Sequence, residues 1–397
     1  MIPTKANPIS ADKPAMVIEY TDPEEGFKGW LVRDRLCHRL CAGGMRVQPG
    51  ITRQTLIDMA RNMTLKMQVA GLRVDGAKSG IDYNPDSPGK NAAIARFLQA
   101  IKPFIECCYS MGPDLNVEMD ELENAAGKVG LPSVKMAVAR AQGWKMDYYL
   151  TRTAILQQEV DGWTVSRLRA GYGVAAAVLA VLDFLEIPHG KACVAIQGFG
   201  TLAKATALRL LKAGVKIVGL ADIDHCLVSQ NSQGLAVHDL LSVGSTRLDV
   251  SAFDQAAIKP SPHITCMECD ILVPAAIENA IIPEIARNLQ VKAVVPGANL
   301  AVPRQSTELL HERAILVLPD FLAGCGGSLS MEGLFGPDDH PEPASVLAHI
   351  DTKMSELVLK ILSRSKNEDI TPTEAARSLC AERTCQPGTR PYGKPGK

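Results

Sequence analysis

The sequence KACVAIQGFGTLAKATALRLLKAGVKIVGLADID, residues 191–224, decides the fold of this chain. Its apolar run 192–197 has the composition of a buried parallel strand, and a G-x-G-x-x-A turn follows directly. The apolar residues of 202–213 then recur at roughly helical spacing, and a second apolar run, 215–220, completes a strand–helix–strand unit. The segment therefore predicts part of a doubly wound parallel sheet.

The turn inside this segment has the residue types of a dinucleotide site. Its glycines allow a tight turn and leave room for a pyrophosphate, while the helix N-terminus offers unpaired N–H groups to the phosphates. Asp222 lies 24 residues after Gly198, near the spacing at which a carboxylate accepts hydrogen bonds from ribose hydroxyls. An ordinary βαβ unit with a glycine-rich turn is the alternative.

Three later apolar runs end in small residues, Asn or Asp, as the carboxyl edge of such a sheet requires where it binds a ligand. These ends are Pro274-Ala275-Ala276, Pro296-Gly297-Ala298-Asn299 and Pro319-Asp320. The residues that we predict to bind the dinucleotide are Gly198, Phe199, Gly200, Thr201, Leu202, Asp222, Ile223, Ala275, Ala276 and Asn299.

Length and composition limit the class of protein. A chain of 397 residues is too long for one compact core, so we expect two domains. A net charge of −1 argues against nucleic acid or an anionic membrane as the main partner, and no apolar run approaches the length of a membrane span. Eleven cysteines, an odd number, favour reduced thiols in a cytoplasm, and the histidines show no metal-ligand spacing, so we assign no metal.

We expect an α/β chain of two domains. Residues 1–163 would form a substrate-binding and oligomerisation domain, and 164–335 a Rossmann-type dinucleotide domain. The helices of 336–384 would return to pack on the first domain, and the Pro/Gly-rich basic tail 385–397 would be disordered.

The first domain carries candidate catalytic residues. Lys66 ends a helix with an apolar opposite face, Lys78 lies in what reads as a glycine-rich loop, and Asp114 follows a Gly-Pro pair. Two lysines that converge on a cleft suit an anionic substrate, and one of them could act as a base beside a carboxylate that relays protons. Taken alone, however, most lysines are solvated surface residues.

These motifs together resemble the amino-acid dehydrogenase superfamily of glutamate, leucine, phenylalanine and valine dehydrogenases, closest to the leucine/phenylalanine branch. The likeness extends from about residue 19 to residue 384. The matching motifs are Gly43-Gly44-Met45-Arg46, Met63-Thr64-Leu65-Lys66, Gly76-Ala77-Lys78, Asp114-Leu115-Asn116-Val117, Gln197-Gly198-Phe199-Gly200, Cys269 to Ala276 and Gly297-Ala298-Asn299.

The resemblance implies a role for each matching residue. Lys66 would hold the substrate α-carboxylate, Lys78 would activate water, and Asp114 would exchange protons with it. Gly43, Gly44, Ala42 and Asn299 would border the substrate, with Asn299 also beside the nicotinamide. The reaction would be NAD-dependent oxidative deamination to a 2-oxo acid and ammonium by hydride transfer to nicotinamide C4, in a homo-oligomer whose interdomain cleft closes.

Some positions depart from the family pattern. Ala42 stands where glutamate-specific members carry a lysine, which argues for an uncharged substrate side chain. Asp75 and Ser79 replace glycines that flank the catalytic lysine, and a negative charge beside Lys78 would favour its charged form, contrary to the needs of a base. Ala170 and Gly324 replace a threonine and an asparagine near the cofactor.

The leading prediction is therefore an NAD-dependent dehydrogenase of an uncharged L-amino acid, with NADP disfavoured because Asp222 would repel a 2′-phosphate. One alternative is a glutamate dehydrogenase that binds the side-chain carboxylate through Arg46 or Arg73. Another is a diverged, catalytically weak homologue that senses a nucleotide or an amino acid.

Overall fold

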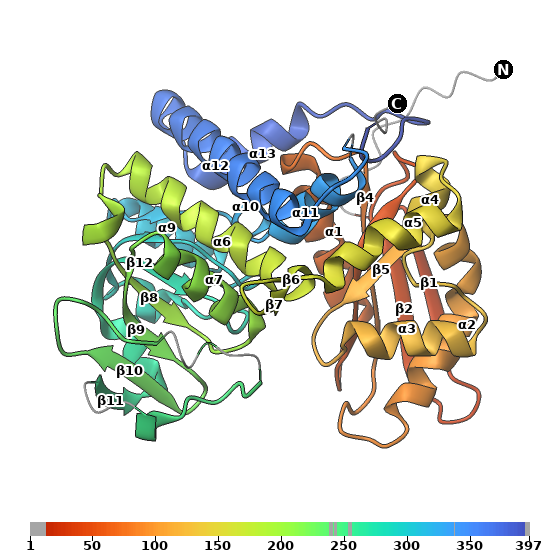
Figure 1. Ribbon diagram of the computed structural model, residues 1–397, viewed down its shortest axis with the longest axis horizontal. Coiled ribbons are helices and arrows are strands. Elements are labelled where there is room, and N and C mark those ends of the chain that lie inside the picture. Colours follow the sequence, from red (N-terminus) through yellow and green to blue (C-terminus); the bar gives the residue numbers. More distant parts are fainter. Residues whose placement is uncertain (1–12, 238–240, 242–243, 253–255, 337, 394–397) are drawn as a thin grey trace. The chain divides into compact units, whose positions relative to one another are not determined.

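The computed structural model describes residues 13–237, 241, 244–252, 256–336 and 338–393. The chain divides into two compact units, each built on its own β-sheet (Figure 1). Unit 1 comprises Met1–Arg152 and Arg383–Lys397, and unit 2 comprises Thr153–Glu382.

The sheet of unit 1 has five strands in the order β1-β2-β4-β3-β5. Strands β3, β4 and β5 are parallel, whereas β2 is antiparallel to both β1 and β4. The strands are β1 (Met16–Thr21), β2 (Lys28–Arg33), β3 (Cys41–Val47), β4 (Asp75–Ile81) and β5 (Tyr109–Pro113). The helices are α1 (Arg53–Val69), α2 (Lys90–Cys107), α3 (Met119–Lys128), α4 (Ala137–Gln142) and α5 (Met146–Thr153), the last of which ends at the border of unit 2.

Two glycine-rich segments that read as loops are strands in the interior of this sheet. β3 pairs with both β4 and β5, and β4 pairs with both β2 and β3. Glycine weakens a strand pattern because it brings no side chain to pack, but here it permits close approach of other backbone atoms. A Cβ on Gly43 would lie 1.7 Å from the carbonyl oxygen of Ala77, and one on Gly76 would lie 2.2 Å from the amide nitrogen of Thr64.

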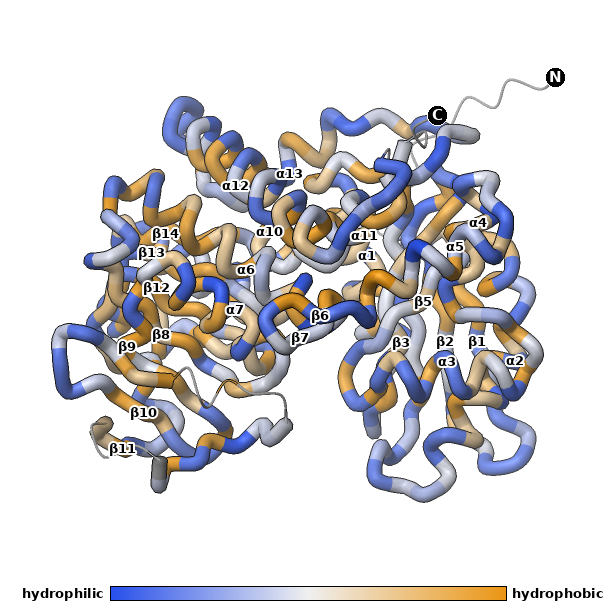
Figure 2. The backbone as a smooth tube through the Cα atoms, viewed as in Figure 1, coloured by the Kyte–Doolittle hydropathy of each residue, from blue (hydrophilic) through white to orange (hydrophobic). Residues whose placement is uncertain are grey.

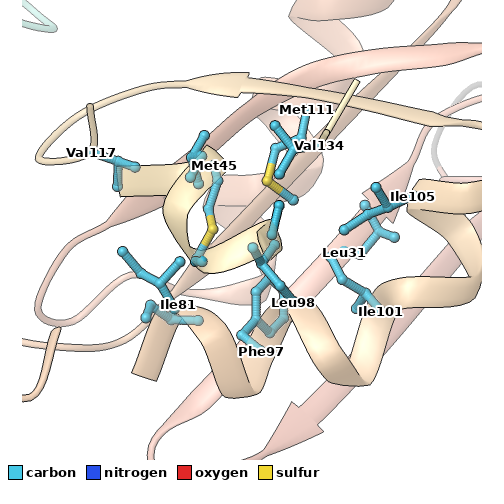
Figure 3. Packing of buried hydrophobic residues seen from close by; sticks show 14 of the residues in the cluster. Leu31, Met45, Ile81, Phe97, Leu98, Ile101, Ile105, Met111, Val117 and Val134 are labelled. Atoms are coloured by element: carbon cyan, nitrogen blue, oxygen red, sulfur yellow. The ribbon is translucent and has the colours of Figure 1, made fainter. Parts of the chain in front are cut away.

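Both faces of this sheet are covered. On one face Met45 and Ile81 pack with Phe97, Leu98 and other residues of α2 in a continuous apolar cluster (Figure 3). On the other face α1 buries Leu56, Ile57, Met59 and Ala60 against Trp30 and Val32 of β2. Since β4 is buried along its whole length, each of its side chains must meet a protein partner on one face or the other.

The sheet of unit 2 has seven strands in the order β11-β10-β9-β8-β12-β13-β14. Its members are β8 (Cys193–Gln197), β9 (Lys216–Ala221), β10 (His225–Ser229), β11 (Ala256–Pro260), β12 (Glu268–Pro274), β13 (Gln290–Val294) and β14 (Leu316–Val317). Strands β8, β9, β12, β13 and β14 are parallel, and β10 is antiparallel to β9 and to β11. Hydrophobic residues concentrate along these strands (Figure 2). Two further short strands, β6 (Glu159–Val160) and β7 (Trp163–Thr164), form a separate hairpin.

The helices of unit 2 are α6 (Val165–Phe184), α7 (Thr201–Lys212), α8 (Pro283–Ala286), α9 (Arg304–Glu312), α10 (Asp320–Ala323), α11 (Gly326–Phe335), α12 (Pro343–Glu368) and α13 (Pro372–Ala381). α6 is long and apolar enough to span a membrane by length and composition, contrary to the expectation from sequence, but 78% of its apolar 18-residue window is buried in the protein. Gly173 lies inside α6 and packs against Gly326 of α11, so its glycines serve helix packing.

The division of the chain near its C-terminus differs from the one expected. Residues 336–382 belong to unit 2, where α12 packs against α6 and α11. The tail from Arg383 does belong to unit 1, and its described part, 383–393, is bound there instead of disordered. The amide of Tyr392 donates to Gln142 Oε1 at 3.3 Å, and the Tyr392 side chain is buried.

The close approach of α1 to β4 gives a test of the unit 1 fold. In Gly76→Ala the new Cβ would collide with the backbone of Thr64 and, at 2.4 Å, of Ala60, so α1 must move off the sheet. We expect a free energy of unfolding lowered by ~1–3 kcal/mol or more in urea titrations. The matched control is Gly127→Ala, an exposed position in α3 with no atom within 4 Å, which should be neutral or stabilising by about 1 kcal/mol. Equal stability of the two variants would contradict this account.

Candidate active site

Lys78 and Asp114 form an ion pair at the carboxyl end of β5. The Lys78 Nζ atom lies 2.6 Å from Asp114 Oδ2, and the lysine side chain is only 5% exposed. Lys78 lies at the middle of β4, and Asp114 directly follows the last residue of β5. The two candidates that the sequence placed 36 positions apart are therefore brought together, which confirms neither role but gives them the contact that an acid–base pair needs.

Gly44 leaves the space that this ion pair occupies. In the parallel register of β3 and β4, Gly44 stands beside Lys78, and the side chains of both positions face the same side of the sheet. A Cβ on Gly44 would lie 2.9 Å from the Asp114 Cβ and 3.5 Å from Lys78 Nζ. The missing side chain of Gly43 thus lets β3 lie close to β4, and that of Gly44 leaves room for the Lys78–Asp114 ion pair.

Arg46 is a third member of this site, with a role that the sequence did not predict. Its Nε donates to Asp114 Oδ2 at 2.9 Å. Burial would raise the pKa of Asp114, but the charges of Lys78 and Arg46 and their hydrogen bonds outweigh it and lower that pKa to about 2. Because its pKa is lowered in the folded state, ionised Asp114 stabilises the fold above the unfolded value, and that contribution is lost as the pH falls towards 2.

Other candidates lie on the same face of the sheet. Ala42 is two positions before Gly44 on β3, and so faces the same side. Lys66 is buried in the last turn of α1, the helix that covers this face. Lys135 is also buried on this face, and its Nζ lies 3.4 Å from a Cβ built on Gly112, the β5 residue that pairs with Gly44. Its Nζ donates to the Met111 carbonyl at 2.7 Å. The sequence gives no sign of this lysine, because its segment lacks a helical or strand pattern.

Asp75 and Ser79, the departures that flank Lys78, have partners of their own on the opposite side of β4. The Asp75 carboxylate accepts from Arg33 Nη2 at 2.8 Å and lies 2.9 Å from His38 Nδ1. The Ser79 hydroxyl lies 2.9 Å from the Tyr109 hydroxyl. Side chains alternate between the faces of a strand, so neither residue shares a face with Lys78. The sequence-based concern that Asp75 acts directly on Lys78 has no support in this geometry.

The dinucleotide candidates of unit 2 gather at the carboxyl ends of two neighbouring parallel strands. Gly198 follows β8, and Ala275 follows β12, which is hydrogen-bonded to β8. Gly198 has φ +120°, and a Cβ there would lie 3.1 Å from the Ala275 backbone and 3.3 Å from the Ala276 Cβ. The connection from β8 leads to β9 on one side while β12 lies on the other, which makes this the switch point where doubly wound sheets bind ligands.

The turn after β8 fits the pyrophosphate of a dinucleotide. Gly200 is the N-cap of α7, and no atom lies within 4 Å of a Cβ built there, so a phosphate can approach the N–H groups of Thr201 and Leu202. Phe199 is buried with the Lys204 ammonium 4.3 Å from its ring centre, which places the aromatic ring in the protein and not in the ligand space. Asn299 lies in the turn after β13, and its neighbour Leu300 donates its N–H to Asp320 Oδ2 at 2.8 Å.

Asp222 does not have the exposure expected of a ribose ligand. Its side chain is 1% exposed. Oδ1 accepts from the amides of Asp224 and His225, and Oδ2 accepts from the amide of Leu248, at 2.7–2.8 Å. The carboxylate therefore closes the β9–β10 turn, and the structure leaves its oxygens no surface to offer a ribose. Ile223, by contrast, is 73% exposed.

The same turn brings together three groups of the kinds that bind metals. One ligand atom each from Asp222, Asp224 and His225 lies within 4.8 Å of the others, the only such group among the described residues. The histidine spacing in the sequence gave no sign of it. Because the Asp222 oxygens are engaged by three amides, we still assign no metal here.

The chain is similar to glutamate dehydrogenases in sequence. The NADP-specific glutamate dehydrogenase of Saccharolobus shibatae is 27% identical over 311 residues, which cover 76% of this chain and 69% of that protein. The glutamate dehydrogenase of Thermotoga maritima is 29% identical over 316 residues, which cover 76% and 71%. An NAD-specific glutamate dehydrogenase of Halobacterium salinarum is 28% identical over 314 residues, 76% of this chain and 67% of that protein.

Solved structures share the fold. A hetero-hexameric glutamate dehydrogenase from Thermus thermophilus, in a leucine-bound form, superposes with a TM-score of 0.74 at 24% identity and covers 93% of this chain and 88% of its own. The L-tryptophan dehydrogenase of Nostoc punctiforme gives a TM-score of 0.62 at 17% identity, with 93% and 95% covered.

Two family models account for most of the chain. Residues 14–129 match the dimerisation domain of Glu/Leu/Phe/Val dehydrogenases, and residues 162–386 match the Glutamate/Leucine/Phenylalanine/Valine dehydrogenase model. With the motifs in order and the site residues gathered at two sheet edges, the chain belongs to the Glu/Leu/Phe/Val family of amino-acid dehydrogenases, oxidoreductases that use a nicotinamide cofactor.

Proposed function

We propose that the protein catalyses the reversible oxidative deamination of an L-amino acid with an uncharged side chain, using NAD. The observation that carries the proposal is the ion pair of buried Lys78 and partly buried Asp114, 2.6 Å apart, on the face of the sheet that also bears Ala42. A carboxylate held between two cations keeps its charge, while the lysine beside it can pass a proton to and from the substrate.

Each residue then has a step. Lys66 holds the α-carboxylate, and Lys135 adds positive charge on the same face of the sheet. A nicotinamide cofactor held at the turn after β8 would supply the acceptor for the hydride of the α-carbon, so that the amino acid becomes an imine. Lys78 takes a proton from a water molecule as that water attacks the imine carbon, and Asp114 exchanges the proton with Lys78 across their short contact. Loss of ammonium gives the 2-oxo acid.

The proposal of an uncharged substrate side chain rests on Ala42 and on the hydrogen-bond partners of two arginines. Arg46 binds Asp114 and Gln48, and Arg73 donates from Nε to Gln386 at 2.8 Å. Both are engaged within the protein, which weakens the proposal that either binds a substrate γ-carboxylate. Glutamate nevertheless remains the second candidate, because the relatives named above are glutamate dehydrogenases.

The proposal of NAD rests on the turn after β9. Hydrogen bonds from three amides outweigh the burial of Asp222 and lower its pKa, so the carboxylate remains ionised within the turn. Asp224 adds an exposed carboxylate, which pairs with Arg247. Two carboxylates at this turn would repel a 2′-phosphate unless Arg247 is released. Relatives named both NAD- and NADP-specific leave the choice to experiment.

We also propose a cytoplasmic homo-oligomer. All eleven cysteines are free thiols, as expected in a reducing compartment. The match of residues 14–129 to a dimerisation domain points to unit 1 as the contact between copies. Its strand β1 lies at an edge of the sheet, where a second chain can add.

Replacement of Lys78 tests the mechanism. We expect Lys78→Ala to lower kcat by ~10²–10⁴-fold, because proton transfer loses its base, while NAD affinity changes little, because the nucleotide residues lie in unit 2. Stopped-flow NADH formation and NADH fluorescence titration measure the two effects. Lys90→Ala, which removes a lysine paired with Glu121 in the same unit, is the control and should keep the wild-type rate. A Lys78→Ala enzyme with wild-type turnover would remove Lys78 from the mechanism.

A panel of amino acids tests the substrate class. We expect turnover of apolar amino acids and little of glutamate, and we expect Ala42→Lys to raise kcat/KM for glutamate by at least about tenfold, since a new cation would stand on the substrate face. Ala42→Met, similar in length but uncharged, is the control. Turnover of glutamate alone by the wild-type protein would favour the second candidate. Binding of NAD with no NADH formed on any amino acid would favour a nucleotide-sensing homologue.

The exposed pair of Asp224 and Arg247 tests cofactor choice. In Asp224→Asn the arginine loses its charged partner and can bind a 2′-phosphate, so we expect the ratio of NADPH to NADH affinity to rise about tenfold. Fluorescence titration of both cofactors measures it. Asp224→Asn with Arg247→Ala is the control and should lose most of the gain. No change in the ratio would show that this turn does not set the preference.

A further inference from the structure

Cys37 and Cys385, 348 positions apart in the sequence, meet in unit 1. The Cys385 thiol donates to the carbonyl oxygen of Cys37 at 3.3 Å, which brings the two residues side by side. Cys385 is exposed and Cys37 is partly exposed, so a small reagent can reach the pair. Neither residue takes part in the proposed reaction.

Cys37 lies on a loop that is held in place by side chains of β2 and β4. This loop joins β2 to β3, and Arg33 Nη2 donates to the carbonyl of His38 at 2.6 Å. Asp75 accepts the His38 amide at 3.0 Å as well as contacting its imidazole. The buried Arg33–Asp75 pair therefore holds the residue next to Cys37 in place.

Cys385 lies on the C-terminal tail, and Arg73 binds this tail through both its side chain and its backbone amide. Arg73 donates from Nε to Gln386, and its amide donates to the carbonyl of Pro391 at 3.4 Å. Beyond these contacts Gln142, itself buried, accepts the Tyr392 amide. Since the loop and the tail are each anchored independently, the approach of the two thiols is set by both segments.

We propose that Cys37 and Cys385 form a thiol–disulfide site, oxidised by a low-molecular-weight disulfide such as glutathione disulfide, which fastens the C-terminal tail to unit 1. Unit 2 is the chain segment between residues 153 and 382, so the bond would close a covalent loop that contains the whole of that unit. The proposal does not depend on the substrate or cofactor of the enzyme.

The exchange balances as two steps. The Cys385 thiolate attacks one sulfur of the small disulfide and expels one small thiolate, which leaves a mixed disulfide on Cys385. Cys37 then loses its proton to solvent, and its thiolate attacks the Cys385 sulfur and expels the second small thiolate. Burial, with contributions from the neighbouring thiol, raises the pKa of Cys37 to about 12. Cys385 is the more exposed of the two residues, so we expect it to react first with the small disulfide.

The test is peptide mapping of the full-length protein after incubation with glutathione disulfide. Trypsin cuts after Arg35, Arg39 and Arg383, so the bond would join peptide 36–39 to the C-terminal peptide that begins at Thr384. We expect this linked peptide in the wild-type protein, its loss on treatment with dithiothreitol, and a stable glutathione adduct on Cys385 in Cys37→Ser. The Cys385→Ser variant should give neither product at the rate of the wild type.

Cys266→Ser is the matched control, because Cys266 is an exposed thiol of unit 2, and this variant should form the linked peptide as the wild type does. Oxidised wild-type protein should also unfold at a higher temperature than oxidised Cys37→Ser, with no such difference after reduction. Absence of the 36–39 link, or links only at Cys107, Cys108 or Cys266, would overturn the proposal.

Discussion

The short contact between Lys78 and Asp114 is the interaction on which the site depends. A buried carboxylate is costly unless cations compensate it, and here Lys78 and Arg46 approach the same oxygen, Oδ2, at 2.6 and 2.9 Å. The three side chains come from β4, β3 and the residue after β5, so the charges can meet only if those strands stand side by side in this register. Glycine at position 44 supplies the space that the register leaves above the sheet.

The same constraint accounts for residues outside the site. β4 is buried on both faces, so the positions that alternate with Lys78 must satisfy their own polar groups on the far side. Asp75 does so with Arg33 and His38, and Ser79 does so with Tyr109. Asp75 and Ser79, which look damaging in sequence beside a candidate catalytic lysine, are thus parts of a second, structural network. That network also positions the loop on which Cys37 lies.

Much of this could be predicted from sequence, and the failures have physical causes. Apolar runs such as 192–197 and the helical spacing of α1 depend on side-chain burial, which a sequence shows directly. The segment around Lys78 reads as a loop because glycine carries no burial signal, yet it forms β4, where the missing side chain of Gly76 permits close contact with the backbone of α1. Asp222 was found at the expected spacing, but spacing does not tell whether a carboxylate faces a ligand or the amides of its own turn.

Arg46 shows why the composition of a site is harder to predict than its location. The sequence offered this arginine as a ligand for a substrate carboxylate, because a cation beside the paired glycines is chemically suited to either purpose. In the structure Arg46 instead binds an internal carboxylate, that of Asp114, which lies 68 positions away along the chain. With Arg46 bound to Asp114, β3 has no other cation to offer beside Ala42, which supports our proposal that packing recognises the substrate side chain. The proposal of an uncharged amino acid therefore rests on the compensation of Asp114 as much as on the absence of a lysine at position 42.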